Sequence, residues 1–434
     1  MRTDIVHIGA GELTYEIRNI VNIGLKLQDY GMKIYWENIG DPVAKGETIP
    51  RWMKEIVADL VMEDSTYGYS PTKGVLETRE FIAEKTNSRG GVQLSGEDVI
   101  FFNGLGDAIS KVFGFLKRTA RVVVPTPSYT THSSAEAAHA GDRPVCYFLD
   151  PYNNWYPDLD DLEKRIKYNP AVAGILIINP DNPTGAVYPE DILRGMIDLA
   201  RRYRLFIICD EVYQNMVYNG MSTTPLSNII GEVPALAMRG ISKEMPWPGS
   251  RCGWIEIYNG HHDPMFEKYV NSILNSKMVE VCSTTLPQTA MPKIVSHPEY
   301  PAYLAGRLAR YERYSRIAYD CLRDIDGILV NQTNGAFYMS VVFKEGVLTH
   351  NQTLPMENEV VRREIEELAS GPDVSLDKRF VYYLLGSTGI CVVPLSSFAT
   401  DLQGFRITLL EHDEEAFRKI FKTVAENIRL YLDS

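Results

Sequence analysis

Short apolar runs alternate with helix-like stretches through the middle of the chain. Several of these runs are apolar throughout, without alternating polar positions, which is typical of strands buried on both faces of a sheet. Strands that alternate with helices predict a layered α/β fold. The runs expected to form strands are Val99–Phe102, Arg121–Val124, Val145–Leu149, Gly174–Ile178, Leu205–Cys209, Ala235–Ile241 and Cys252–Ile257.

Both ends of the chain carry a different pattern. Residues Leu13 to Lys33 show the apolar spacing of an amphipathic helix. A charged, helix-like stretch from Pro301 to Arg323 leads into an α+β mixture that ends in a helix from about Glu414. We therefore predict two domains. The large domain covers residues 45–320, and the smaller one combines residues 1–44 with residues 321–434.

Composition and charge narrow the possible functions. The chain has 434 residues and a formal net charge of −12 without a basic stripe, so nucleic acid is not an expected partner. It has no apolar run of about 18 residues or more, which argues against a membrane span. The six cysteines form no C-x-x-C pair and no cluster with histidine, so no metal site is expected. Such isolated thiols suit a reducing compartment, and we predict a cytoplasmic protein.

A glycine turn follows the first expected strand. Asn103, Gly104, Leu105 and Gly106 would open a helix here. The free backbone N–H groups and the dipole of such a helix suit a phosphate group. The turn is not a dinucleotide-binding fingerprint, because position 109 is isoleucine where a small residue is required. A plain strand-to-helix turn without a ligand explains the same residues about equally well.

Polar residues also follow three later strands. Asn182 lies in a turn with two prolines and a glycine, Asp210 follows an apolar run, and Lys243 follows another. Singly, they are typical of an ordinary turn, a helix N-cap and a surface lysine. However, ligands of open α/β sheets bind at the carboxyl ends of strands, and the intervals between these residues each fit one strand–helix–strand unit. We therefore expect them to converge on one crevice. Asp210 and Glu211 should not act as a catalytic pair, since neighbouring strand residues face opposite sides.

The order of these residues resembles that of the class I/II aminotransferases, which are fold type I enzymes that depend on pyridoxal 5'-phosphate (PLP). The resemblance covers roughly residues 38–425. It implies a large domain with a mostly parallel seven-stranded sheet sandwiched by helices, together with a smaller α+β domain. The matching segments are Tyr69–Gly74 with Leu76 and Arg79, Pro127–Tyr129, Asn182–Gly185, Asp210–Tyr213, Ser242–Lys243 with Arg251, and Phe405–Thr408.

The resemblance implies a role for each residue around the cofactor. Lys243 would hold PLP as a Schiff base and later carry the proton between the substrate Cα and the cofactor. Asp210 would pair with the pyridinium nitrogen and keep the ring an electron sink. The remaining implied contacts are Asn182 and Tyr213 on the ring oxygen, Tyr129 on the ring face, and the N–H groups of Leu105 and Gly106 together with Arg251 on the phosphate.

The resemblance also implies how substrate and subunits are arranged. Arg406 would clamp the substrate α-carboxylate with two parallel hydrogen bonds, with Asn182 and the Gly40 backbone nearby. Tyr69 would reach the phosphate in the neighbouring subunit, which implies a homodimer. The implied reaction is a ping-pong transfer of an amino group between an L-amino acid and a 2-oxo acid through Lys243.

Three positions depart from the family pattern. Gly240 stands where serine or threonine usually contributes to the phosphate site, Trp247 lies between two prolines, and Leu395 replaces a common glycine. These departures weaken an assignment to any particular subfamily.

Other functions fit parts of the same pattern. A PLP-dependent lyase or decarboxylase would use the same lysine, aspartate and arginine, so the motifs leave that alternative open. A transcription regulator with this fold would need a DNA-binding segment, but the segment before Gly40 is too short and not basic enough. A non-catalytic binding protein would be expected to lose Lys243 or Asp210, and both are present.

The substrate side chain is the least constrained feature. A dicarboxylate would need a second cation beside Arg406, whereas a neutral or aromatic amino acid would need an apolar pocket. The N-terminal segment offers both kinds of residue if it folds over the site. We favour a neutral or aromatic amino acid, with 2-oxoglutarate or pyruvate as the acceptor. The cations in question are Arg18, Lys26 and Lys33, and the aromatic residues are Tyr15, Tyr35 and Trp36.

Overall fold

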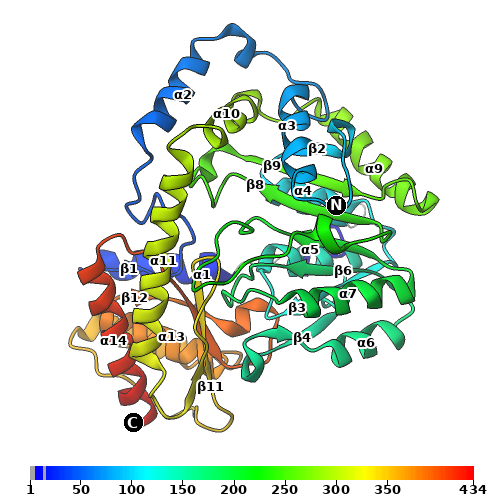
Figure 1. The fold of residues 1–434 in the computed structure, drawn as a ribbon. Helices are drawn as coiled ribbons and strands as arrows, with labels where there is room; N and C mark the ends of the chain where they lie inside the picture. Colours follow the sequence, from blue (N-terminus) through cyan, green and yellow to red (C-terminus); the bar gives the residue numbers. More distant parts are fainter. Residues whose placement is uncertain (1–4, 13–15) are drawn as a thin grey trace.

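A computed structural model describes residues 5–12 and 16–434 of the chain, with the backbone alone for residues 16–18. Its larger sheet has eight strands in the order β2-β9-β8-β7-β6-β3-β4-β5 (Figure 1). Strands β8, β7, β6, β3 and β4 are parallel, whereas β9 is antiparallel to both of its neighbours and β5 is antiparallel to β4. The strands are β2 Val99–Asn103, β3 Arg121–Thr126, β4 Cys146–Asp150, β5 Tyr156–Pro157, β6 Val172–Ile178, β7 Phe206–Asp210, β8 Ala235–Gly240 and β9 Cys252–Tyr258.

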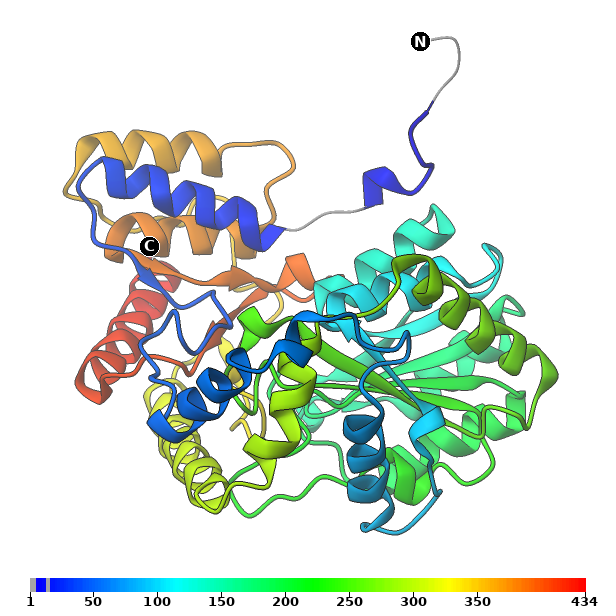
Figure 2. The same ribbon diagram turned by 90° about the horizontal axis from the view of Figure 1, so that it is seen from above.

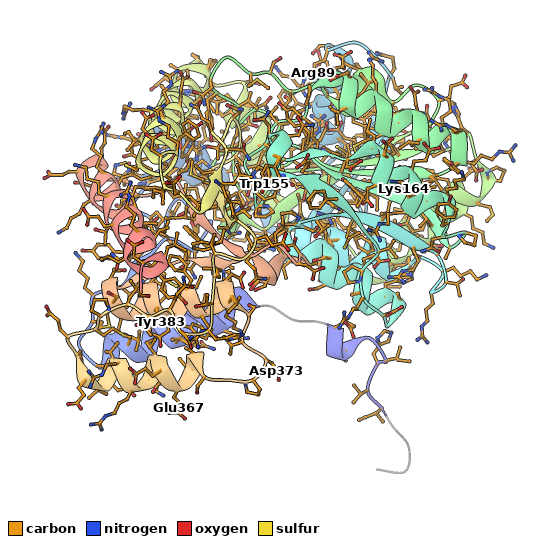
Figure 3. The ribbon with its side chains drawn as sticks, turned by 90° about the horizontal axis from the view of Figure 1, so that it is seen from below. Arg89, Trp155, Lys164, Glu367, Asp373 and Tyr383 are labelled. Carbon is orange, nitrogen blue, oxygen red and sulfur yellow. The ribbon has the colours of Figure 1, made fainter. Side chains whose placement is uncertain are left out.

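All seven predicted strands are confirmed, with bounds within two residues of the expected ones. The expected number of strands was one too low, because β5 is a two-residue edge strand that carries no hydrophobic period. Asn154 and Trp155, with φ of 53° and 62°, turn the chain after β4 and bring β5 back beside it. The Trp155 side chain is buried in the core on one face of the sheet (Figure 3).

The strands are apolar throughout because helices cover both faces of this sheet. Along β6, Ile175 and Ile177 pack with α6 and α7, whereas Leu176 and Ile178 pack with α4 and α9. A further core at the β2–β9 edge includes α2, α3 and α10. The helices of this part are α2 Arg51–Val61, α3 Leu76–Asn87, α4 Leu105–Gly114, α5 Thr130–Ala140, α6 Leu159–Lys167, α7 Glu190–Tyr203, α8 Leu226–Ile229, α9 Pro264–Glu280 and α10 Thr285–Val295.

The two ends of the chain share a second core. A four-stranded antiparallel sheet of order β10-β11-β14-β13 and a parallel pair of β1 and β12 lie within it. Helix α1 packs beside α12 and α13, which are distant in sequence (Figure 2), and Lys26 on α1 pairs with Glu364 on α12 at 2.6 Å. The elements are α1 Glu16–Asp29, β1 Tyr35–Trp36, α11 Tyr300–Leu322, β10 Ile328–Val330, β11 Tyr338–Phe343, α12 Glu359–Ala369, α13 Leu376–Thr388, β12 Ile390–Cys391, β13 Val393–Pro394, β14 Gly404–Thr408 and α14 Glu414–Leu432.

The helices predicted for the chain ends are confirmed with adjusted bounds. The predicted helix from Leu13 is α1, which ends at Asp29 because Gly31 then takes a positive φ of 88°. Leu13 itself lies outside the described residues. Helices α11 and α14 occupy the two predicted C-terminal stretches. The domain boundaries at 44/45 and 320/321 stay a prediction, and α11 crosses the second boundary.

Two further observations concern the whole of the described chain. No helix in residues 5–12 or 16–434 is long and apolar enough to cross a membrane. The six cysteines all lie in this part and are free thiols.

Candidate active site

The polar residues that the sequence singled out lie at the carboxyl ends of the parallel strands in the large sheet, which form one edge of it. Strands β6, β7 and β8 are parallel and in register, so that Ile178 lies opposite Asp210 and Asp210 opposite Met238. The turn with Asn182 follows β6, and Lys243 follows β8 at the same edge. Strand β9 runs the other way, so Arg251 immediately before it also lies at this edge. The predicted convergence of the strand ends is therefore what the topology produces.

Asp210 is buried and held by a histidine that the sequence did not reveal. One carboxylate oxygen lies 2.9 Å from Nε2 of His132 on α5, and the other accepts the Val212 N–H at 3.1 Å. The Tyr129 ring meets the His132 ring edge to face, with centroids 6.1 Å apart. Glu211 faces away and pairs with Arg239 at 2.7 Å, as expected for neighbouring strand residues. Asp210 thus accepts the N–H of a residue two positions later, as a helix N-cap would. It also contacts the ring of His132, which is distant in sequence.

Lys243 lies beyond its strand and not on it. Strand β8 ends at Gly240, so Lys243 follows the strand by three residues, and its side chain is half-buried. The Lys243 ammonium donates a hydrogen bond to the Gly40 carbonyl at 2.8 Å and lies 5.6 Å from the Phe337 ring centre. The residues between Gly240 and Lys243 place Nζ beyond the end of β8, next to Gly40 and Phe337, which belong to the N-terminal and C-terminal parts of the chain.

Arg406 contacts Asn182 and shares Tyr338 as a neighbour with Gly40. Arg406 on β14 is buried, and its guanidinium donates to Asn182 Oδ1 at 3.2 Å and to the carbonyl of Asn38 at 2.7 Å. The guanidinium carbon lies 4.6 Å from the Tyr338 ring centre. Gly40 lies so close to the Tyr338 hydroxyl that no side chain would fit there.

Tyr338 links this group to Tyr213. The Tyr213 hydroxyl donates to the Tyr338 hydroxyl at 3.1 Å. Burial, followed by the effect of Tyr338, raises the pKa of Tyr213 well above its usual value, so the phenol stays protonated. Tyr338 was missed as a candidate because Gly335–Tyr338 shows only as a break before a strand, and nothing local places it near Gly40.

The glycine turn after β2 forms a cradle beside Arg251. Gly104 has a φ of +82°, a conformation that favours glycine, and a Cβ there would lie 2.6 Å from Arg251 Nη2 and would displace the guanidinium. The first N–H groups of α4, including those of Leu105 and Gly106, have no acceptor within the helix and point out of its end. The guanidinium and these donors together form a place for an anion.

The close approach of β8 and β9 accounts for one departure from the family pattern, the glycine at position 240. The Leu105 side chain lies 3.0 Å from where a Gly253 Cβ would stand and 3.7 Å from where a Gly240 Cβ would stand. A Gly240 Cβ would also come within 3.1 Å of the Cys252 carbonyl. Glycine at position 240 therefore allows β8, β9 and the start of α4 to approach closely, at the expense of a hydroxyl.

Some predicted residues stand apart from this group. Tyr69 is 86% exposed. Lys26 pairs with Glu364, and Lys33 lies over the Tyr35 ring at 4.8 Å, so the structure engages both lysines elsewhere. Tyr15 and the Arg18 side chain lie outside the described residues. Tyr35 and Trp36 form β1 beside β12.

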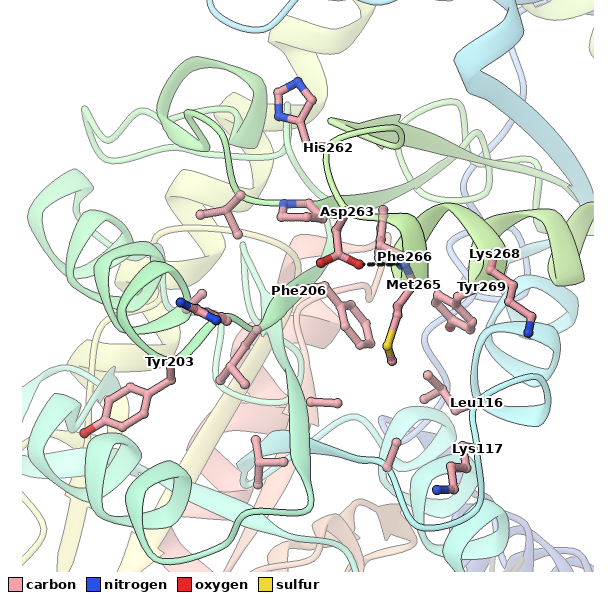
Figure 4. A pocket seen from close by; sticks show the side chains of 18 of the residues that line it. Leu116, Lys117, Tyr203, Phe206, His262, Asp263, Met265, Phe266, Lys268 and Tyr269 are labelled. Carbon is pink, nitrogen blue, oxygen red and sulfur yellow. Dashed lines mark hydrogen bonds between the residues drawn. The ribbon is translucent and has the colours of Figure 1, made fainter.

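A separate cavity of about 800 Å³ lies at the amino ends of the parallel strands, opposite to the candidate site. Phe206, Phe266 and Tyr269 form an aromatic cluster in its wall (Figure 4). Val172 and Phe206 open strands β6 and β7, so this cavity adjoins the amino ends of the strands. None of the residues that line it belongs to the candidate site, and it is therefore not a candidate for the substrate.

Comparison with known proteins identifies the family. The sequence profile described as aminotransferase class I and II matches residues 38–424. An uncharacterised aminotransferase of Methanocaldococcus jannaschii is 60% identical over 432 residues and is covered completely, as is this chain. The glutamate-pyruvate aminotransferase AlaA of Escherichia coli is 29% identical over 331 residues, which is 75% of this chain and 79% of that protein.

Solved structures agree with these relatives. The alanine aminotransferase of Pyrococcus furiosus matches with a TM-score of 0.82 and 26% identity over 98% of each chain. An aspartate aminotransferase of Thermus thermophilus, at 21% identity and a TM-score of 0.80, shares the fold over 98% of this chain and 100% of its own. The chain therefore belongs to the class I and II aminotransferase family and is an aminotransferase of fold type I.

Proposed function

We propose that this aminotransferase holds PLP on Lys243 and moves an amino group between an L-amino acid and a 2-oxo acid by a ping-pong mechanism. One observation carries the proposal. The Lys243 amine and the Arg406 guanidinium are joined through a single set of contacts, because Gly40 accepts from Lys243 and abuts Tyr338, whose ring lies beside Arg406. An amine and a guanidinium that share one set of neighbours suit an α-amino acid, which carries an amino group and a carboxylate on the same carbon.

The residues fit the cofactor at both of its ends. The Gly104 cradle with Arg251 and the free N–H groups of α4 would hold the phosphate. Asp210 is a buried carboxylate whose partners are one imidazole and one N–H, and a pyridinium N–H would supply the compensating positive charge. When bound, PLP supplies the electron sink that stabilises charge on the substrate Cα. His132 would hold Asp210 in place, and Tyr129 would cover the ring.

The chain's own residues would divide the remaining work. Arg406 binds the α-carboxylate and, with Asn182, fixes the orientation of the Cα–H bond. Lys243, once its amine is free, takes the proton from Cα and later returns a proton, as a general base and acid. The protonated Tyr213 would donate a hydrogen bond to the cofactor ring oxygen in place of its present bond to Tyr338.

We propose a neutral amino acid as the donor, with pyruvate or 2-oxoglutarate as the acceptor. The names of the alanine and glutamate-pyruvate aminotransferases among the relatives support this choice. Two buried cations of the N-terminal and α11 segments are already paired, since Lys45 binds Glu37 at 2.6 Å and Arg307 binds Glu47. Neither is therefore free to bind the second carboxylate of a dicarboxylate, which favours pyruvate over 2-oxoglutarate as the acceptor. An aromatic amino acid is the second proposed donor, and the half-reaction described below tests it together with the neutral amino acids.

We further propose that the enzyme is a homodimer in which Tyr69 serves the partner's site. Tyr69 belongs to a group of exposed apolar side chains around the end of α9 and the segment before α3. Thr285 and the Gly68 carbonyl, 2.8 Å apart, join these two segments. The exposed side chains are Met62, Tyr67, Tyr69, Met278, Val279 and Val281. Such a patch is typical of a protein interface.

Mixing two inactive variants tests the shared site. A mixture of the Tyr69→Ala and Lys243→Ala variants should show activity that each variant lacks, and a mixture without activity would contradict shared sites. A cytoplasmic location of the protein also stays a prediction.

The test of the function is a single half-reaction. Addition of one amino acid, without an acceptor, should bleach the visible absorbance of the bound cofactor once, and a 2-oxo acid should restore it. Borohydride reduction and peptide mapping should place the label on Lys243, with Lys243→Ala as the unlabelled control. If the absorbance persists while ammonia or carbon dioxide accumulates, the enzyme is a lyase or decarboxylase and the proposal fails.

A further inference from the structure

A buried ion pair lies directly behind Lys243. Arg307 on α11 and Glu47 are 4% and 7% exposed, and the Arg307 guanidinium contacts both carboxylate oxygens of Glu47. Tyr311 also bonds to both partners, at 3.1 Å from Arg307 Nη2 and 3.3 Å from Glu47 Oε2. Burial by itself would raise the pKa of Glu47, but Arg307 and Arg310 outweigh burial and hold the pKa below its usual value. Glu47 is therefore a carboxylate, and the pair is ionic.

The free edge of the Arg307 guanidinium holds the backbone of the active-site lysine. Nη1 donates to the carbonyl of Lys243 at 3.0 Å and to the carbonyl of Glu244 at 2.6 Å. The Glu244 side chain is fixed in turn by the Tyr300 hydroxyl and by Asn215 Nδ2, the latter at 2.8 Å. Two successive carbonyls that are bound by one nitrogen of a buried, planar guanidinium leave this peptide little freedom.

Glu47 belongs to the same short segment as Gly40, which accepts from the Lys243 amine. Backbone hydrogen bonds within residues 41–47 close the segment into a compact turn, with the Glu47 N–H on the Pro42 carbonyl at 2.9 Å. Lys45 ties the turn to Glu37 at 2.6 Å and to Glu411 at 3.1 Å. Lys243 is thus connected to this turn twice, through its side chain at Gly40 and through its main chain at Arg307 and Glu47.

We propose that Arg307 and Glu47 form a positioning pair, which fixes the main chain of Lys243 relative to the Gly40 turn so that the lysine amine meets the substrate Cα. The proposal rests on the proposed function and adds two residues to it. Lysine has a flexible four-carbon side chain, so the place of its amine depends on where its main chain is held. A displacement of about 1 Å at a reacting group can lower a rate by about 10²-fold. Neither residue touches the substrate in this proposal.

The first test compares two arginines on the same helix. Arg307→Gln removes the charge and the fork, whereas Arg310→Gln removes a second partner of Glu47, bound at 2.6 Å, without touching the Lys243 main chain. The single-turnover rate with an amino donor should fall by about 10–100-fold in Arg307→Gln, with cofactor content unchanged and KM within about threefold. Arg310→Gln should keep most of the rate. Arg307→Lys should recover part of the loss, since a lysine keeps the charge beside Glu47.

A second readout does not depend on the reaction. In the cofactor-free protein, Arg307→Gln and Glu47→Gln should both increase amide hydrogen exchange in peptides that cover residues 241–250, and Glu47→Gln also in residues 38–47. Arg310→Gln should leave residues 241–250 as in the parent.

The outcomes separate the two proposals. A folded Arg307→Gln enzyme with the parental half-reaction rate and parental exchange overturns the positioning role, as does an equal loss in Arg310→Gln. If Arg307→Gln does not fold, Glu47→Gln and Arg307→Lys decide by the same two measurements. If the parent itself is not bleached by any amino donor, the proposed function fails, and exchange at residues 241–250 still decides whether the pair holds the lysine.

Discussion

The two halves of the candidate site are built in different ways. The sheet half consists of the groups at strand ends, namely Asp210 and the Gly104 turn with Arg251. The terminal half consists of Gly40, Tyr338 and Arg406, which come from the two ends of the chain. In the sheet half, strand order alone brings the groups to one edge. In the terminal half, the groups meet only because the first and last parts of the chain fold into one core.

The phosphate end of the sheet half differs in exposure from the carboxylate clamp. Arg251 and Gly106 are exposed, whereas Arg406 is buried and already hydrogen-bonded to Asn182, which follows β6. A phosphate site can stay open, because helix N–H groups and a flexible arginine bind it from one side. A carboxylate clamp that must fix the Cα–H direction needs groups whose positions are set in advance. The difference suggests that the sheet half binds the cofactor and the terminal half selects the substrate.

The largest expected effect tests the sheet half. Asp210→Ala removes the negative charge at the proposed pyridinium position, and kcat should fall by about 10²–10³-fold, as when one preorganised electrostatic contact is lost. KM for the amino donor should change little, because the contact matters most as charge develops on Cα. Steady-state kinetics with PLP in excess measure both. Near-normal turnover would show that Asp210 only caps the backbone at Val212.

The next effect tests the terminal half. Arg406→Lys keeps the charge but loses the planar fork, so kcat/KM for amino acids should fall by about 10–100-fold while PLP content stays unchanged. Amines without a carboxylate, tested as poor donors, should be affected much less. If they lose activity equally, Arg406 does not bind the carboxylate. A fall in PLP content would break the proposed division between the halves.

A smaller effect is expected at the phosphate cradle. Gly104→Ala places a Cβ 2.6 Å from Arg251 Nη2 at a φ of +82°. The cofactor should bind about 10-fold more weakly, since the displaced arginine loses a charge-assisted hydrogen bond to the phosphate that contributes on the order of 1–2 kcal/mol. Gly106→Ala is the matched control, because its Cβ would meet no atom within 4 Å. Equilibrium dialysis of PLP distinguishes the two, and equal affinities would contradict the cradle.

The last effect concerns stability, not activity, and tests the place where the halves meet. Burial raises the pKa of Asp181, next to Asn182, to about 7. Below about pH 4 the carboxyl is protonated in both states, between pH 4 and 7 only the unfolded chain ionises, and above pH 7 both ionise. Stability should therefore decrease from pH 4 to 7 and then level off. Asp181→Asn should gain about 1–3 kcal/mol over the parent at pH 8 and almost nothing at pH 4.5, by urea unfolding. A gain that is equal at both values would show that Asp181 is not protonated in the fold.

Much of the sheet half could be predicted from the sequence. Apolar runs marked the seven long strands, and the polar residues after them predicted that Asn182, Asp210 and Lys243 would lie at the same ends of the strands. The prediction succeeds because parallel strands joined by helices must present their carboxyl ends at the same edge. The prediction missed β5, because a strand of two residues shows no hydrophobic pattern. It also did not show that Lys243 lies three residues beyond the end of β8.

Only the tertiary structure decided the rest. His132 shows no pattern of its own on α5, yet it reaches Asp210 across the sheet edge. Arg307 and Glu47 are ordinary charged residues in sequence, and their role depends on how α11 packs behind Lys243. The sequence determined the order of the elements and which residues end each strand, because hydrophobic periodicity is a local property. It could not determine which distant side chains meet, because that depends on the packing of whole helices and sheets against one another.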